Sequence, residues 1–385
     1  MSLIEQFSKF EKNLRPMMSH LPPEKAVRIL TKGRKEFLER LIDDTPPVRM
    51  KHSPNVSKKI WGIEFSCPLF NAAGVFKNGF GYELCAAQGA GAFLAGTTTF
   101  LPRQGNIKNG IEHPFASYPR SGAAANWMGL PNQGHEEVAA KISKIEKKLG
   151  CPVGISISSS PEQGGEDALE GVLRGLQMFD KAGVDFVEIN ESCPNVSHKE
   201  TLSESSIPEP EKIISTSLDT RLLNRLEYLY EKFLNKRTRN LPVVLKLSND
   251  TDKRSLTALL DIMFALGFDG VNIGNTSTDY EYCLSKIVPA EQKLFKYFAD
   301  TFGGGVSGAP LKQKSLDLAG FAAEYTANFP PNQEFHVIRT GGINLTADIT
   351  ASEKAGISLN QWFTGYFENF AESGHALYKI FFENL

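Results

Sequence analysis

From residue 68 onward, short apolar runs alternate with longer segments that have helical periodicity. The apolar runs, which predict buried strands, cover residues 69–73, 92–97, 153–158, 186–190, 243–247, 270–274, 336–340 and 361–365. The segments between them predict helices near 82–88, 136–149, 168–182, 222–234, 256–266, 316–327 and 349–355. Eight strands joined by helices favour an α/β fold, a parallel (β/α)₈ TIM barrel over residues 45–385. A doubly wound sheet is disfavoured because no Gly-x-Gly-x-x-Gly follows the first strand.

Residues 1–44 predict an N-terminal hairpin of two amphipathic helices. One apolar stripe consists of Leu3, Phe7, Phe10, Leu14, Met17 and Leu21. Pro22 and Pro23 then break the chain before a second helix that opens at Glu24. Basic residues outnumber acidic ones in this segment. Two interpretations stay open, a helical cap docked on the barrel and a surface that lies against an anionic membrane.

Composition narrows the class of protein. The chain has 385 residues, 41% of them hydrophobic and 22% charged, and its net charge of -2 argues against binding nucleic acid through phosphate neutralisation. The five cysteines are widely spaced and form neither a Cys-x-x-Cys pair nor a cluster with histidines, so we expect reduced thiols and no metal centre. With no signal-peptide core and no long apolar run, the expected location is cytoplasmic.

Polar or glycine residues follow every predicted strand. They are Asn71 and Lys77, Thr97 and Thr98, Ser156 and Ser158, Asn190 and Cys193, Lys246, Asn275, Gly341 and Gly342, and Thr364 and Gly365. In a parallel barrel these strand ends converge on one face, where barrel enzymes place their active sites. The pattern therefore predicts a site at that face.

Two glycine-rich turns near the C-terminus are candidates for binding a phosphate. Thr340-Gly341-Gly342-Ile343 follows the seventh predicted strand, and Phe363-Thr364-Gly365 ends the eighth. Barrel enzymes commonly hold a phosphate between these two loops, where glycine allows close backbone approach. A third turn, residues 303–308, could close over the same group. The alternative is ordinary turn chemistry, since glycine also caps helices.

Two further residues suggest proton and charge chemistry. Cys193 lies between Asn190 and Asn195 just after a buried strand, and a thiol can act as a base. The alternative is a structural cysteine in a Pro-Asn turn. Lys246, on a central strand, needs an electron-rich partner if it points inward, because burying an unpaired ammonium is costly. The alternative is a lysine that reaches solvent.

Together these segments resemble the dihydroorotate dehydrogenase family over nearly the whole chain. The segment 71–79, Asn-Ala-Ala-Gly-Val-Phe-Lys-Asn-Gly, resembles the first flavin-contacting loop of the family. Residues 126–132, Asn-Trp-Met-Gly-Leu-Pro-Asn, resemble its substrate loop, and residues 190–195, Asn-Glu-Ser-Cys-Pro-Asn, resemble its base loop. Residues 306–311 and 340–343 match its flavin-phosphate region.

The resemblance implies FMN at the barrel mouth, with dihydroorotate and its product orotate stacked on the flavin. Cys193 then corresponds to the base that removes the C5 proton while hydride leaves C6, and Lys246 is the second catalytic residue. The implied substrate contacts are Lys77, Asn126, Asn190, Asn195, Asn275 and Thr276. The implied FMN contacts are Ala73, Lys77, Thr97, Ser156, Asn190, Lys246, Gly308, Gly341, Gly342, Phe363, Thr364 and Gly365.

The resemblance is divided between two subclasses. The N-terminal hairpin is similar to that of membrane-associated class 2 enzymes, which reduce quinones and normally use a serine base. Cysteine is instead the base of cytosolic class 1 enzymes, which lack the hairpin. We expect a quinone acceptor, with the hairpin forming a lid over the flavin; whether the hairpin also touches the cytoplasmic face of a membrane stays open. The alternatives are fumarate or another acceptor, another dihydropyrimidine substrate, or a catalytically silent FMN-binding protein.

Overall fold

A computed structural model describes residues 1–46, 48–191 and 219–383. Eight parallel strands form the central sheet in the order β3-β15-β14-β12-β11-β10-β9-β4. They are β3 (Leu69–Asn71), β4 (Phe93–Thr98), β9 (Val153–Ile157), β10 (Phe186–Asn190), β11 (Val243–Leu247), β12 (Gly270–Ile273), β14 (His336–Thr340) and β15 (Leu359–Trp362). The chain after β3 closes the ring against β4, because Gly74 N–H donates to Gly96 O at 2.7 Å and Gly96 N–H to Phe76 O at 3.1 Å. The predicted (β/α)₈ barrel is confirmed.

Helices surround this barrel, close to the predicted segments. They include α3 (Tyr82–Gln88), α4 (His135–Ile142), α5 (Gly165–Lys181), α6 (Thr220–Lys232), α7 (Lys253–Ala265), α10 (Lys312–Asn328) and α11 (Thr346–Lys354). The helix predicted over 136–149 ends at Ile142, and Leu149 is exposed. The eighth strand was predicted over 361–365, but β15 ends at Trp362, and Thr364 begins α12 (Thr364–Ser373). The predicted strand begins at residue 361 rather than at Leu359 because Asn360 and Gln361, although buried in β15, are polar and interrupt the apolar run.

A three-stranded antiparallel sheet beside the barrel mouth was not predicted. It pairs β7 (Phe115–Tyr118), β8 (Ala123–Asn126) and β13 (Gly305–Gly308) in the order β13-β8-β7. The interpretation of residues 303–308 as a turn was therefore wrong for Gly305–Gly308. A side chain at Gly305 would overlap Thr276, so glycine allows this strand to pass close to the chain that follows β12.

The remaining elements flank these two sheets. They are the hairpins β1 (Lys58–Ile60) with β2 (Ile63–Phe65) and β5 (Ile107–Lys108) with β6 (Ile111–Glu112), and the helices α8 (Tyr280–Ser285), α9 (Pro289–Phe302) and α13 (Leu377–Phe382). Short 3₁₀ turns cover Pro54–Val56, Pro119–Ser121, Leu234–Lys236, Ala309–Leu311 and Gly374–Ala376.

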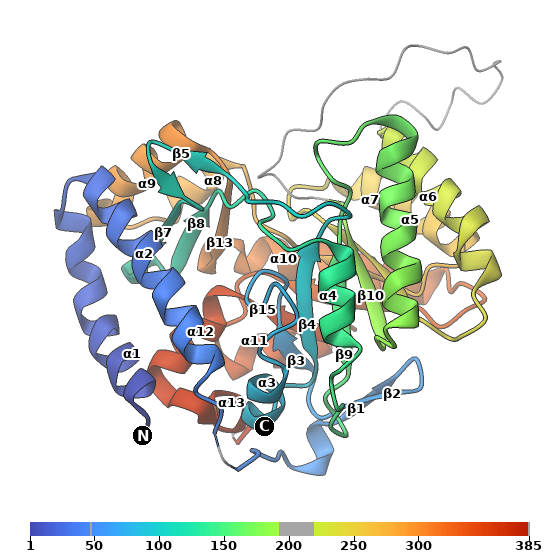
Figure 1. The fold of residues 1–385 in the computed structure, drawn as a ribbon, viewed down its shortest axis with the longest axis horizontal. Helices are drawn as coiled ribbons and strands as arrows, with labels where there is room; N and C mark the ends of the chain where they lie inside the picture. Colours follow the sequence, from blue (N-terminus) through green and yellow to red (C-terminus); the bar gives the residue numbers. More distant parts are fainter. Residues whose placement is uncertain (47, 192–218, 384–385) are drawn as a thin grey trace.

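The N-terminal hairpin consists of α1 (Leu3–Leu14), a 3₁₀ turn (Arg15–His20) and α2 (Pro23–Ile42). α1 packs on α12, and α2 packs on β7 and α9 (Figure 1). Ala26, Val27 and Leu41 on α2 are fully buried. The predicted stripe on α1 behaves differently, because Leu3 and Phe10 are 85% and 62% exposed. Within the described residues, no helix combines the length and the apolar character needed to cross a bilayer.

Candidate functional site

A cavity of about 1130 Å³ lies at the carboxyl ends of the barrel strands, where the sequence predicted a site. The predicted residues that line it are Ala73, Lys77, Thr97, Asn126, Asn190, Lys246, Asn275, Thr276, Gly308, Gly341, Gly342, Phe363, Thr364 and Gly365. Ser156 does not line it; it is buried behind Thr97, with its hydroxyl 3.0 Å from that of Thr97. Cys193 and Asn195 lie outside the described residues. We refer to this space as the barrel cavity.

Amide and hydroxyl groups on neighbouring strand ends are linked along one wall of the barrel cavity. Asn190, at the end of β10, donates from Nδ2 to Thr97 Oγ1 at 3.1 Å. Its Oδ1 accepts from Asn275 Nδ2 at 3.0 Å, and Asn275 Oδ1 accepts from the Thr276 N–H at 2.9 Å. These contacts orient each amide, because only one assignment of oxygen and nitrogen satisfies all three bonds. The wall therefore presents ordered donors and acceptors to a planar polar ligand.

Lys246 lies at the floor of the barrel cavity and is only 3% exposed. Its ammonium is 3.3 Å from Glu188 Oε1 and 3.1 Å from Gln361 Oε1. The alternative that this lysine reaches solvent is therefore excluded, and the electron-rich partner that its burial requires is a carboxylate of the chain itself. Glu188 and Gln361 were not among the predicted site residues, since a polar residue inside a strand gives no sign of the side chains that it contacts across the barrel.

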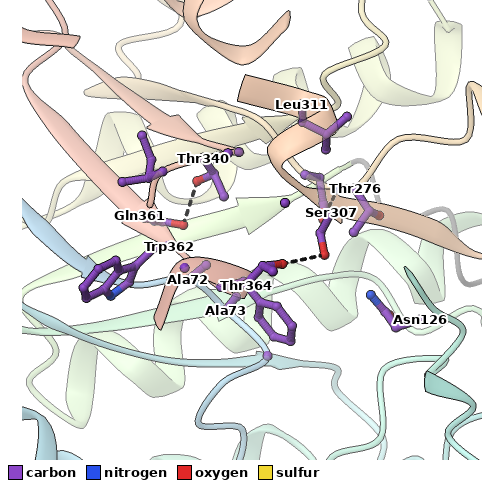
Figure 2. A pocket seen from close by; sticks show the side chains of 18 of the residues that line it. Ala72, Ala73, Asn126, Thr276, Ser307, Leu311, Thr340, Gln361, Trp362 and Thr364 are labelled. Atoms are coloured by element: carbon purple, nitrogen blue, oxygen red, sulfur yellow. Dashed lines mark hydrogen bonds between the residues drawn. The ribbon is translucent and has the colours of Figure 1, made fainter. Parts of the chain in front are cut away.

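The two predicted glycine-rich turns meet at one end of the barrel cavity. Gly342 has a φ of +69°, and a Cβ there would overlap the backbone of Lys312 at the start of α10. A Cβ at Gly365 would overlap Ile343 O, so the absence of a side chain lets the turn after β14 contact the N-terminus of α12. The Ser307 and Thr364 hydroxyls are 3.0 Å apart beside these turns (Figure 2). We refer to these two turns, Ser307 and the α12 N-terminus as the cradle.

The cradle suits an anion such as a phosphate. A helix N-terminus presents backbone N–H groups and a partial positive charge. One carboxylate, that of Glu368 on α12, also lines the barrel cavity, but Arg15 Nη1 binds it at 2.6 Å. A side chain at Gly342 would strike the backbone of Lys312, so glycine at this position lets the turn after β14 pack closely against α10.

A second cavity of about 1170 Å³ separates the hairpin from the barrel, and we refer to it as the hairpin cavity. Its lining is mostly apolar and includes Phe7, Leu14, Ile29, Leu30, Gly33, Phe37, Phe115, Ala123, Ala124 and Phe367. Phe363, Thr364 and Glu368 line both cavities, so the two meet at the α12 N-terminus. A lid was predicted here, but the sequence contains no sign of the cavity beneath it.

Arg34 of α2 is the cation placed between the hairpin cavity and the barrel. Its guanidinium lies 5.3 Å from the Phe115 ring centroid and 5.5 Å from that of Phe363. Nη2 donates to Gly74 O at 3.4 Å, whereas Nε has no hydrogen-bond partner among the described residues. Burial lowers the pKa of Arg34 to about 10, which still leaves it charged at neutral pH. Arg34 therefore brings a positive charge to a mostly apolar lining.

A closed barrel with glycine-rich turns, a helix N-terminus and an amide-lined wall at its C-terminal face defines the class of the (β/α)₈ barrel enzymes. Residues 44–377 match the sequence model of the family described as dihydroorotate dehydrogenase, and the chain belongs to that family. Members of this family depend on a flavin.

Curated relatives named dihydroorotate dehydrogenase (quinone) include one from Cyanothece sp., 28% identical over 82% of this chain and 76% of its own. Another, from Methylococcus capsulatus, is 27% identical over 93% of this chain and 94% of its own. The ligand-free enzyme of Eimeria tenella has a similar fold, with a TM-score of 0.70 and 19% identity over 91% of this chain and 92% of that one.

Proposed function

We propose that this chain is an FMN-dependent dihydroorotate dehydrogenase that passes its electrons to a quinone. The observation that carries the proposal is the meeting of two unlike cavities at the α12 N-terminus. The barrel cavity carries amide, hydroxyl and ammonium groups that suit a flavin phosphate and a small anionic heterocycle, whereas the lining of the hairpin cavity is mostly aliphatic and aromatic and suits an isoprenoid quinone. Phe363 and Thr364 line both cavities, so electrons need to travel only a short way between their occupants.

The chain supplies groups that fit each part of FMN and of the substrate. The cradle would hold the phosphate, while Ala73, Thr97 and Lys246 would contact the ring. The Asn190–Asn275 wall, together with Asn126 and Lys77 from the same cavity lining, would hold the pyrimidine and its carboxylate. When bound, FMN supplies a two-electron acceptor. Cys193 and Asn195, from the base loop, would complete the site, with Cys193 taking the C5 proton.

The cradle can be tested with one matched pair of variants. Ser307→Asp is expected to weaken FMN retention at least roughly tenfold, because the new carboxylate would accept hydrogen bonds from the N–H groups of the cradle and repel the phosphate. Ser307→Asn has the same shape without the charge and should retain far more flavin. Flavin absorbance per mole of folded protein measures the difference. An Asp variant with a full flavin complement would place the phosphate elsewhere.

The acceptor can be tested by turnover. With dihydroorotate as the donor, we expect a long-tailed quinone to support faster turnover than fumarate at equal concentrations. The observation favouring fumarate is the cysteine of the base loop, which is similar to the class 1 base. A turnover rate with fumarate that matches or exceeds the rate with quinone would refute the quinone proposal. The hairpin cavity would then have no role in binding the acceptor.

We also propose that α1 touches the cytoplasmic face of a membrane. Leu3 and Phe10 are exposed on α1, and so is Lys9 beside Phe10, whereas Lys12 is paired with Glu372. Apolar residues beside basic ones favour binding to anionic lipid. The double variant Leu3→Glu/Phe10→Glu is expected to lose most co-sedimentation with anionic vesicles. Leu149→Glu, at an equally exposed residue outside the hairpin, should bind like the wild type; equal binding by all three proteins would refute the contact.

A further inference from the structure

Glu188 is a carboxylate buried in the centre of the barrel. It lies on β10, is 1% exposed, and is absent from the lining of the barrel cavity. Its Oε1 is 3.3 Å from the Lys246 ammonium. Its Oε2 accepts two hydrogen bonds, from Asn272 Nδ2 at 2.7 Å and from Gln361 Nε2 at 2.8 Å. Glu188 thus sits one layer beneath the floor that Lys246 and Gln361 form.

The surrounding hydrogen bonds hold this ion pair in one arrangement. Gln361 donates to Glu188 from Nε2 and accepts from Lys246 at Oε1, so its amide cannot rotate without losing both contacts. The Thr340 hydroxyl lies 3.0 Å from Gln361 Oε1 and 2.9 Å from Asn272 Oδ1, which locks the two amides together (Figure 2 shows the Thr340–Gln361 bond). These contacts come from β10, β11, β12, β14 and β15, so the network is as rigid as the barrel wall.

Such a pair is costly to bury and has no necessary role in stability. A buried ion pair can often be replaced by apolar residues with little loss of folding stability, whereas removing one partner leaves an uncompensated buried charge. Interactions between charges in a buried site are also stronger than at a surface. The electrostatic consequence is that the negative charge of Glu188 offsets the positive charge of Lys246, the cation that faces the barrel cavity.

We propose that Glu188 is a positioning residue that lowers the reduction potential of the flavin by neutralising Lys246. This inference rests on the proposed function, since it requires FMN above Lys246. Reduction of FMN by dihydroorotate moves two electrons and one proton to the flavin as hydride, and a second proton to the base. Reduced flavin carries more negative charge than oxidised flavin, so an uncompensated ammonium beneath it would favour reduction. Glu188 opposes that effect and keeps the reduced flavin able to donate onward to its acceptor.

The test is a charge cycle at the two positions, read as the flavin midpoint potential of the loaded protein. Glu188→Gln leaves Lys246 uncompensated and is expected to raise the potential by at least roughly 30 mV, a tenfold change in the two-electron equilibrium constant. Lys246→Gln leaves Glu188 uncompensated and is expected to lower it. The double variant restores neutrality and should return toward the wild-type potential. A purely structural role would not produce shifts of opposite sign that cancel in the double variant.

Glu188→Asp provides a second variant if the glutamine variant does not fold. It keeps the charge but withdraws it by one methylene, so its shift should be positive and smaller. Folded, flavin-loaded Gln and Asp variants with the wild-type potential would overturn the inference, as would shifts of the same sign from Glu188→Gln and Lys246→Gln. Wild-type protein that binds no flavin would instead refute the proposed function, so the two failures are distinguishable.

Discussion

Replacing Cys193 with alanine is expected to leave FMN bound while slowing flavin reduction by dihydroorotate about 10²–10⁴-fold, the usual cost of losing a general base. FMN binding should survive because the cradle and the Lys246 floor lie on other elements. Cys193→Ser should fall between the two proteins, and its rate should climb toward high pH because a hydroxyl is harder to deprotonate than a thiol. Stopped-flow reduction at several pH values measures both effects.

A second cysteine provides the control for that experiment. Cys283 is buried in α8 and does not line the barrel cavity, and burial raises its pKa to about 11. Cys283→Ala should therefore reduce its flavin at the wild-type rate. If the Cys193→Ala protein also reduced its flavin at that rate, Cys193 would have no part in the mechanism.

Filling the hairpin cavity from Gly33 is expected to abolish turnover with a long-tailed quinone while sparing flavin reduction by dihydroorotate. Gly33 lies inside α2 and lines this cavity, and a Cβ there would meet no atom within 4 Å. Gly33→Phe can therefore place a ring in the space proposed for the quinone. Turnover with a small soluble dye should survive, because the barrel cavity is unchanged.

Gly33→Ala is the matched control. It adds only a methyl group and should stabilise α2 by roughly 0.5–1 kcal/mol without blocking the cavity. Comparing steady-state rates with quinone and with dye distinguishes a loss of quinone access to the flavin from a loss of flavin reduction by dihydroorotate. Full quinone turnover by the Phe variant would show that the acceptor reaches the flavin by another path. Deleting residues 1–44 tests this less sharply, because it would also uncover the surfaces now packed against Val27 and Leu41.

The barrel could be predicted because its strands are short and apolar with regular spacing. The bounds of β10 and β11 match the predicted 186–190 and 243–247, since buried apolar side chains begin both strands and recur along them. The β7-β8-β13 sheet was missed because alanine in β8 and glycine in β13 give no strand signal. Small residues occupy these positions because the backbones of β8 and β13 pass close to neighbouring segments, and this proximity exists only in the folded chain.

The sequence allowed the site residues at the strand ends to be predicted, but not the contacts that their side chains make with one another. The glycines and amides that follow the barrel strands could be placed at the barrel mouth because each comes after an apolar run, whereas Asn126 on β8 and Gly308 on β13 were expected from the family resemblance. The pairing of Glu188 with Lys246 joins residues 58 positions apart and has no local signature. The hairpin cavity likewise depends on how α2 docks on the barrel. Cys193 and Asn195 lie outside the described residues, and their roles stay predictions from the resemblance.

The most direct measurement is anaerobic mixing of the purified protein with dihydroorotate while flavin absorbance and orotate are followed together. The account predicts yellow protein whose absorbance bleaches as one orotate forms per flavin, and whose colour returns when quinone is added. Colourless protein, or bound FMN that dihydroorotate does not reduce, would contradict it.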